Sequence, residues 1–203
     1  MNRKGELKGS LRGVQVELKG RMLWIMGCVF ALAMGCVFAL LTSCQDEATM
    51  GYSTKYRVQF FMETPQAPDL HNTMVTPGRY ISIRQGTQSR IRLETPEGSV
   101  TEIAPSAVAA SSFYYGLGGL IVGNTYTGEA VAYDLSCPTC DRQQYRLTIT
   151  NDGYATCSHC ATRYDLNNYG VITETAEEKP ANLRGLYRYR IVYTYGTSIN
   201  VYN

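Results

Sequence analysis

Two pairs of closely spaced cysteines restrict what this chain can fold into more than any other feature does. The pairs are Cys137-Pro138-Thr139-Cys140 and Cys157-Ser158-His159-Cys160, and sixteen residues separate them. Two residues between cysteines allow both thiolates of a pair to face one ion, and two such pairs can complete a tetrahedron. This spacing falls within the range of four-cysteine zinc sites. The sequence therefore predicts a metal site formed by Cys137, Cys140, Cys157 and Cys160.

The segment between the two pairs has the pattern of a β-hairpin. An alternating run over residues 145–150 is followed by Asn151-Asp152-Gly153, and the chain returns through Tyr154. Asp and Gly both tolerate the positive φ angles that tight hairpin turns require. We therefore expect this hairpin to bring the two cysteine pairs together.

The rest of the chain after residue 55 also has the composition of an all-β protein. Tyrosine, with 16 residues, is the most over-used type, and such residues favour strands. Turn residues separate alternating runs, and this pattern predicts antiparallel sheets. The expected strands cover residues 56–61, 80–84, 90–94, 120–122, 130–135, 145–150, 187–194 and 198–202.

Three segments between these runs have other compositions. Residues 64–76 contain Pro65, Pro68 and Asn72, and we predict a surface loop there. Residues 106–110 alone have a helix-friendly composition. The glycine-rich segment 111–124 is expected to be a tightly packed loop leading into a strand, because no Walker-type Lys-Ser/Thr follows it.

The first 43 residues have the pattern of a secretory signal. A basic segment precedes an apolar run over residues 22–41, and the run ends in Leu41-Thr42-Ser43-Cys44. These last four residues resemble the lipobox read by lipoprotein signal peptidase, which implies that Cys44 carries lipid. The alternative is an uncleaved membrane anchor, since the run is long enough to cross a bilayer. The true start codon could also lie downstream of Met1.

This pattern divides the chain into a signal peptide over residues 1–43, a tether over 44–55 and a β domain over 56–203. The expected location is the cell envelope, with the domain lipid-anchored to a membrane and either periplasmic or surface-exposed, in an oxidising compartment. Acidic residues slightly outnumber basic ones after Cys44, and no basic stripe indicates nucleic acid. The expected partners are the membrane and an unknown protein.

Residues 112–203 resemble a Rieske domain. Rieske domains carry Cys-Pro-His in one loop and, in a second, Cys, two residues, His, Gly, Ser, any residue, Tyr or Phe, and Asp. This chain has Cys137-Pro138 in the first position, and the second reads Cys157-Ser158-His159-Cys160-Ala161-Thr162-Arg163-Tyr164-Asp165. The resemblance implies an antiparallel Rieske-like β-sandwich with a metal-binding tip of two loops.

The ligand positions of the family are only partly retained. Cys137 and Cys157 match its cysteine ligands, whereas Cys160 stands at the position of the second histidine. Thr139 stands at the position of the first histidine, so that Cys140, one residue further on, would replace it. Both histidines that raise the potential of a Rieske centre are therefore absent, which argues against a respiratory role.

Other residues of the second loop follow the family more closely. Thr162 and Tyr164 match the hydroxyl residues that hydrogen-bond to the cluster sulfurs in Rieske domains, although ordinary strand packing would also account for them. Ala161 replaces a glycine. His159 is not at a ligand position, and we interpret it as an exposed loop residue.

Three states of the four cysteines remain open: one zinc ion, a [2Fe–2S] cluster or two disulfides. Zinc is preferred, because an exported chain without a twin-arginine motif folds outside the cell, where clusters are not inserted. The corresponding functions are a structural zinc supporting a binding role and, as an alternative, electron transfer. No catalytic residue is predicted, since only His71, expected in a loop, and His159 are available, and four thiolates leave zinc no open position.

Overall fold

The regular secondary structure of the domain is mostly antiparallel strand, in two sheets. The computed structural model describes residues 51–104, 113–176 and 182–203. The larger sheet contains Val58–Glu63 (β1), Arg79–Gln85 (β2), Ile91–Glu94 (β3), Val100–Ile103 (β4), Tyr114–Tyr115 (β5), Leu120–Asn124 (β6), Ala130–Asp134 (β7), Arg188–Thr194 (β12) and Ser198–Tyr202 (β13). The smaller sheet contains Leu147–Ile149 (β8), Tyr154–Cys157 (β9), Arg163–Asp165 (β10) and Val171–Glu174 (β11).

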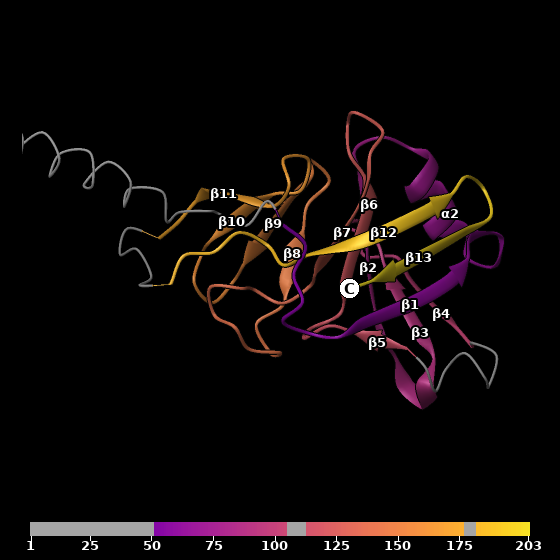
Figure 1. The fold of residues 1–203 in the computed structure, drawn as a ribbon, viewed down its shortest axis with the longest axis horizontal. Coiled ribbons are helices and arrows are strands. Elements are labelled where there is room, and N and C mark those ends of the chain that lie inside the picture. Colours follow the sequence, from indigo (N-terminus) through magenta and orange to yellow (C-terminus); the bar gives the residue numbers. More distant parts are fainter. Residues whose placement is uncertain (1–50, 105–112, 177–181) are drawn as a thin grey trace, which may run out of the picture. The chain divides into compact units, whose positions relative to one another are not determined.

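All neighbouring strands in both sheets run antiparallel, which confirms the expected all-β fold. The order in the larger sheet is β4-β3-β2-β6-β7-β12-β13-β1-β5, and the order in the smaller sheet is β11-β10-β9-β8 (Figure 1). The expected hairpin between the cysteine pairs is the β8–β9 hairpin. Its turn contains Gly153, whose φ of 77° only glycine adopts readily.

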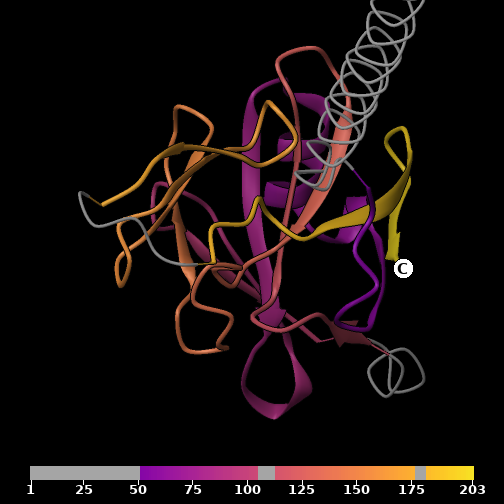
Figure 2. The same cartoon turned by 60° about the vertical axis from the view of Figure 1, so that its left-hand side comes forward.

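Strands β6 and β7 contribute to two separate hydrophobic cores. Leu120, Val122 and Ala132 belong to the first core, with residues of β1, β2, β3 and β13. Ile121 and Tyr133, which point to the opposite side, belong to the second core, with residues of the smaller sheet. Strands covered on both faces have few polar positions, as these two do. Figure 2 shows the smaller sheet on one side of these strands and the β12–β13 hairpin on the other.

The predicted loop over residues 64–76 is wrong, because the segment forms a short 3-10 helix, Thr64–Gln66, and an α-helix, Pro68–Val75 (α2). Pro68 lies in the first turn, where its missing N–H has no intrahelical acceptor to lose. Leu70 and Met74 lie four positions apart, and both are buried in the first core. His71, expected in a loop, therefore lies on α2.

The described part of the glycine-rich segment is a tightly packed loop leading into β6, as predicted. Gly116 has a φ of 73°. A Cβ atom on Gly118 would lie 2.8 Å from the backbone nitrogen of Ser136, which is closer than side chains pack. The loop thus lies directly against the residue that precedes the first cysteine pair.

Several predictions concern residues outside the described ranges. They are the signal peptide over residues 1–43, the lipidation of Cys44, most of the tether and the helix-friendly stretch 106–110. Within the part of the chain that the structure describes, no helix is long and apolar enough to span a bilayer.

Candidate metal centre

The four predicted cysteine ligands meet in one cluster. The Sγ atoms of Cys137, Cys140, Cys157 and Cys160 all lie within 4.8 Å of one another. Between the two pairs, the Sγ atoms of Cys137 and Cys160 lie 3.5 Å apart and those of Cys140 and Cys157 lie 3.9 Å apart. Zinc–sulfur bonds of about 2.3 Å place tetrahedral thiolates about 3.8 Å apart. The cluster can therefore hold a metal ion.

Each cysteine pair forms a turn, which we call a knuckle, and the two knuckles have the same local conformation. In the first, the Asp141 N–H donates to the Cys137 carbonyl at 2.8 Å; in the second, the Ala161 N–H donates to the Cys157 carbonyl at 2.9 Å. Asp141 and Ala161 both have left-handed φ angles, 52° and 53°. A left-handed residue costs about 1–2 kcal/mol when it carries a Cβ atom. In each knuckle, the residue directly after the second cysteine therefore has a strained backbone conformation.

The β8–β9 hairpin and its neighbours hold the knuckles in place. The Cys137 N–H donates to the Tyr145 carbonyl at 2.9 Å, which closes the loop that contains the first knuckle. The Cys157 N–H donates to the Thr162 carbonyl at 3.0 Å, which closes the second. Within the hairpin, Cys157 pairs with Leu147 of β8. Backbone hydrogen bonds at the ends of the smaller sheet's strands thus determine where both knuckles begin.

The cluster lies at the edge of the second core. Cys137 and Cys157 are fully buried, whereas Cys140 and Cys160 are half-buried. Burial raises the pKa of Cys137 to about 11 and also raises the pKa of Cys140. Burial acts in the same direction on Cys160, but hydrogen bonds from the Thr162 hydroxyl and backbone N–H outweigh it and lower that pKa to about 7. A cation at the centre would stabilise thiolates and displace these protons.

Two buried hydroxyl groups lie beside the sulfurs. The Thr162 hydroxyl is 3.2 Å from the Sγ of Cys160, and the Tyr164 hydroxyl is 3.4 Å from the Sγ of Cys137. The Thr139 and Tyr164 hydroxyls lie 3.0 Å apart. Hydroxyls at these positions can donate to thiolates and stabilise their negative charge. Thr162 and Tyr164 thus contact the sulfurs, although Tyr164 is also part of the second core.

His159 is exposed, as interpreted from the sequence, but from the second knuckle it contacts the first. Its ring stacks on Tyr145 with centroids 3.8 Å apart and an interplanar angle of 27°. Its Nδ1 atom lies 3.4 Å from the Sγ of Cys140. His159 therefore covers the solvent side of one half-buried sulfur.

The sequence reasoning missed a buried carboxylate beside the first knuckle. Asp134 is fully buried at the end of β7 and accepts five hydrogen bonds. Its donors are the N–H groups of Leu117, Gly118 and Ser136 and the hydroxyls of Ser136 and Tyr189, at 2.6–3.1 Å. A single Asp inside a run of buried apolar residues is the signal that could have identified it. Through these hydrogen bonds, Asp134 connects the glycine-rich loop, the start of the first knuckle at Ser136, and β12.

A second missed group connects the start of the domain to the first knuckle. The carboxylate of Asp141, the residue after Cys140, contacts Lys55 in an ion pair and accepts hydrogen bonds from Tyr56 at 2.7 Å and Tyr187 at 2.9 Å. Burial would raise the pKa of Asp141, but these three donors outweigh it and lower that pKa. No sequence pattern relates residues so far apart in the chain.

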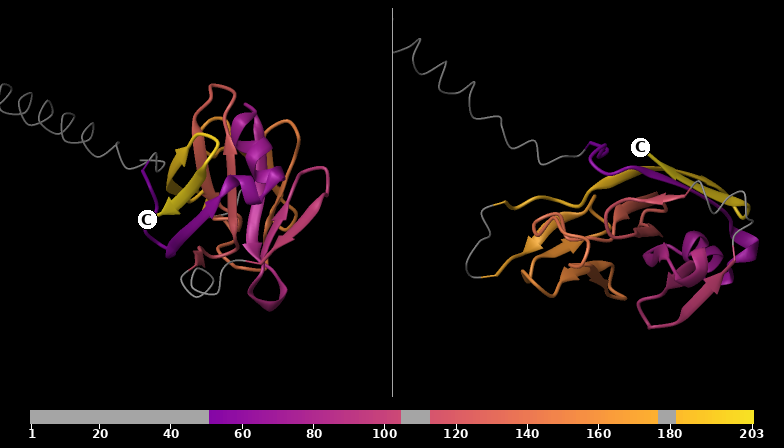
Figure 3. Two further views of the ribbon diagram at one scale, coloured as in Figure 1. Left: turned by 90° about the vertical axis from the view of Figure 1, so that its right-hand side faces the viewer. Right: turned by 90° about the horizontal axis from the view of Figure 1, so that it is seen from below.

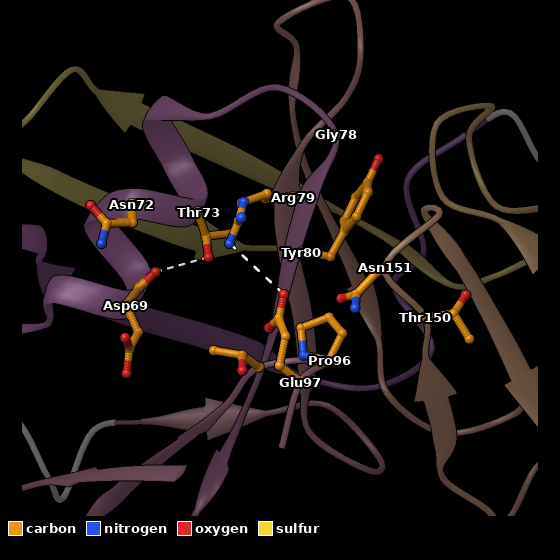
Figure 4. A pocket seen from close by; sticks show the side chains of 11 residues that line it. Asp69, Asn72, Thr73, Gly78, Arg79, Tyr80, Pro96, Glu97, Thr150 and Asn151 are labelled. Atoms are coloured by element: carbon orange, nitrogen blue, oxygen red, sulfur yellow. Dashed lines mark hydrogen bonds and ion pairs between the residues drawn. The ribbon is translucent and has the colours of Figure 1, made fainter. Parts of the chain in front are cut away.

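A polar hollow of about 310 Å³ lies elsewhere in the domain, between α2, β2 and the β8–β9 turn. Figure 4 shows the Arg79 guanidinium directed toward the Glu97 carboxylate, 3.9 Å away, with Asp69 and Thr73 of α2 nearby. No cysteine or histidine is among the residues that line it. Among the described residues, the group of three or more potential ligands close enough to hold one ion is the four cysteines.

No protein-family model matches the chain, and neither the curated proteins nor the solved structures contain a significant match. The geometry of the cysteine cluster is therefore the basis of the functional argument.

Proposed function

We propose that this chain is a cell-envelope lipoprotein whose β domain binds one zinc ion through Cys137, Cys140, Cys157 and Cys160, and that the ion supports a binding role by holding the two knuckles together. The observation that carries the proposal is the convergence of four sulfur atoms within 4.8 Å, supplied by two knuckles of equal conformation.

The distances between the sulfurs favour a single ion. In a [2Fe–2S] cluster each iron holds two of the four cysteines, so sulfurs on different irons lie further apart than sulfurs around one ion. Here all four sulfurs lie within 4.8 Å of one another, and two distances between the knuckles, 3.5 and 3.9 Å, bracket the tetrahedral value for zinc. Four thiolates also fill the coordination sphere, as in structural zinc sites rather than catalytic ones.

The second candidate is electron transfer by iron, and the buried hydroxyls favour it. Hydrogen bonds to ligand sulfurs adjust the reduction potential of iron–sulfur centres. Thr162 and Tyr164 lie 3.2 and 3.4 Å from two of the sulfurs. Both residues match the Rieske pattern. We therefore also propose that the domain descends from a Rieske domain, with zinc in place of the cluster in the preferred interpretation.

Metal analysis of the anaerobically purified protein distinguishes these candidates. The proposal predicts a colourless protein with one zinc per chain. Two iron ions and two sulfide ions per chain would show that the site holds a [2Fe–2S] cluster and not zinc. One iron ion without sulfide would indicate a single iron held by four thiolates. Cys140→Ser should abolish tight zinc binding, whereas Ser158→Ala, an exposed change in the same site, should not. Oxidised cysteines without metal would contradict the proposal.

Labelling with radioactive palmitate tests the lipoprotein part separately. Cys44→Ala should remove the label and block processing, because the thiol is the expected attachment point. Cys36→Ala, which changes a cysteine inside the apolar run, is the matched control and should leave labelling intact. Normal labelling of the Cys44→Ala variant would show that the lipidation site is wrong.

A further inference from the structure

Large apolar side chains are exposed together on the outer face of β12, β13 and β1. Val192 is 50% exposed and Phe61 is 48% exposed, and both lie opposite Asn200, which separates them on the central strand. Tyr202, two residues further along β13, is a diagonal neighbour of both. These residues point away from the first core, which lies on the other side of the same strands.

Tyrosines and arginines extend this face on both sides. Tyr114 of β5 lies opposite Gln59 of β1, and the Arg57 guanidinium lies 3.8 Å from the Tyr114 ring centroid. At the other edge, the Arg190 guanidinium lies 5.3 Å from the Tyr52 ring centroid. Within the described ranges, neither arginine forms an ion pair with a carboxylate. We call the surface formed by Tyr52, Arg57, Phe61, Tyr114, Arg190, Val192 and Tyr202 the aromatic face.

The chain enters the domain at the edge of the aromatic face. The Ser53 N–H donates to the Arg188 carbonyl at 2.7 Å, and the Asn203 side chain donates to the Ser53 carbonyl at 3.1 Å. Figure 3 shows the start of the described chain beside β12 and the C-terminus. Seven residue steps separate Cys44 from Gly51, and they span at most about 25 Å. A lipid on Cys44 would therefore keep this edge close to the bilayer.

We propose that the aromatic face rests on the headgroup region of the membrane that holds the lipid. The proposal depends on lipidation of Cys44. Tyrosine suits this region because its ring is apolar and its hydroxyl can remain hydrated. Arg57 and Arg190 can bind lipid phosphates. Phe61 and Val192, which have no apolar cover among the described residues, would reach the start of the acyl chains.

A single tryptophan can report this contact. The only natural tryptophan is Trp24, within the predicted signal peptide, so the processed protein should contain none. Val192→Trp places the reporter on the aromatic face, and Val171→Trp places it on β11 of the smaller sheet, at an exposed position of the same residue type. Phe61→Trp repeats the first test at a second position.

The full lipidated protein is reconstituted in phosphatidylcholine–phosphatidylglycerol vesicles that carry bromine, a fluorescence quencher, on the acyl chains. Tryptophan at 192 or 61 should lose roughly half of its emission or more, because a side chain in the interface lies within reach of the acyl boundary, and tryptophan at 171 should lose under about a tenth. Replacing both Arg57 and Arg190 with glutamine should weaken quenching at 192.

Each other outcome overturns the proposal in a recognisable way. Equal quenching at 192 and 171 would mean that the domain has no fixed orientation. Protection of 192 from a soluble quencher without quenching by bromine would mean that another protein copy covers the face. The mass of the purified chain is measured first, since a chain that retains Trp24 or lacks lipid refutes the anchor itself, and the proposal falls with it.

Discussion

Replacing the buried Asp134 with asparagine should destabilise the domain by about 2–3 kcal/mol. The size of this loss in unfolding free energy follows from the hydrogen-bond donors around the Asp134 carboxylate. Its Oδ1 atom accepts from the Gly118 N–H and from the N–H and hydroxyl of Ser136, whereas Oδ2 accepts from the Leu117 N–H and the Tyr189 hydroxyl. An amide must place its NH₂ group against one of these two sets.

The less costly orientation places the NH₂ group at the Oδ2 position. The Tyr189 hydroxyl can then rotate and accept, but the Leu117 N–H, 2.7 Å away, cannot. One hydrogen bond to a charge is lost and one buried donor remains unsatisfied, which accounts for about 2–3 kcal/mol. Tyr189→Phe removes one hydrogen bond alone and should cost about 1.5 kcal/mol.

Urea unfolding at a fixed concentration of free zinc measures these differences. Asp152→Asn is the control, because Asp152 is exposed and its salt bridge with Arg163 should contribute less than about 1 kcal/mol. Zinc affinity should also fall in the Asp134→Asn variant, since Ser136 directly precedes Cys137. A cost within about 0.5 kcal/mol, the size of an ordinary surface substitution, would refute the reasoning.

Ala161→Gly should stabilise the protein by about 0.5–1 kcal/mol in thermal unfolding, because relief of the left-handed strain exceeds the entropy that glycine adds to the unfolded chain; a lower melting temperature would contradict this. Zinc affinity, measured by chelator competition, should fall with falling pH, because the raised pKa values of Cys137 and Cys140 mean that binding displaces their protons. The decrease should steepen below pH 7, where free Cys160 also binds a proton; an affinity independent of pH would exclude thiolate ligands. Mild oxidation of the metal-free protein should join Cys137 to Cys160 and Cys140 to Cys157, whose sulfurs lie 3.5 and 3.9 Å apart, and peptide mapping that finds disulfides within each pair would contradict the arrangement.

The sequence predicted the features that depend on strong local patterns. Every predicted run overlaps a strand. In β1 and β13 the alternation reflects one buried and one exposed face, whereas β6 and β7 are buried on both faces and are rich in apolar residues. The predicted cysteine cluster forms because the hairpin turn at Asp152-Gly153 brings the knuckles together. The short strands β4, β5, β10 and β11 were not predicted. β11 has no buried residue, so pairing with β10 and not burial determines its conformation.

Interactions between distant segments could not be predicted in the same way. Helix α2 was taken for a loop because its prolines were interpreted as helix breakers, although Pro68 occupies a position where proline is compatible with a helix. The contacts of Asp141 with Lys55 and Tyr187 depend on the folded arrangement of three separate segments. Likewise, the five donors to Asp134 come from a loop, from Ser136 just before the first knuckle and from a distant strand, and only the fold brings them together.

The contact between Lys55 and Asp141 gives the domain a defined path for mechanical force. Lys55 is the last residue of the predicted tether and precedes β1, while Asp141 directly follows Cys140, one of the four candidate metal ligands. Tension applied to the chain at its predicted lipid end would load the backbone hydrogen bonds of Ser53 first and this contact next, before the hydrogen bonds of β1. Drag on a domain anchored in this way would thus load the first knuckle before the sheet, and a bound ion would resist that load as a cross-link between the two knuckles.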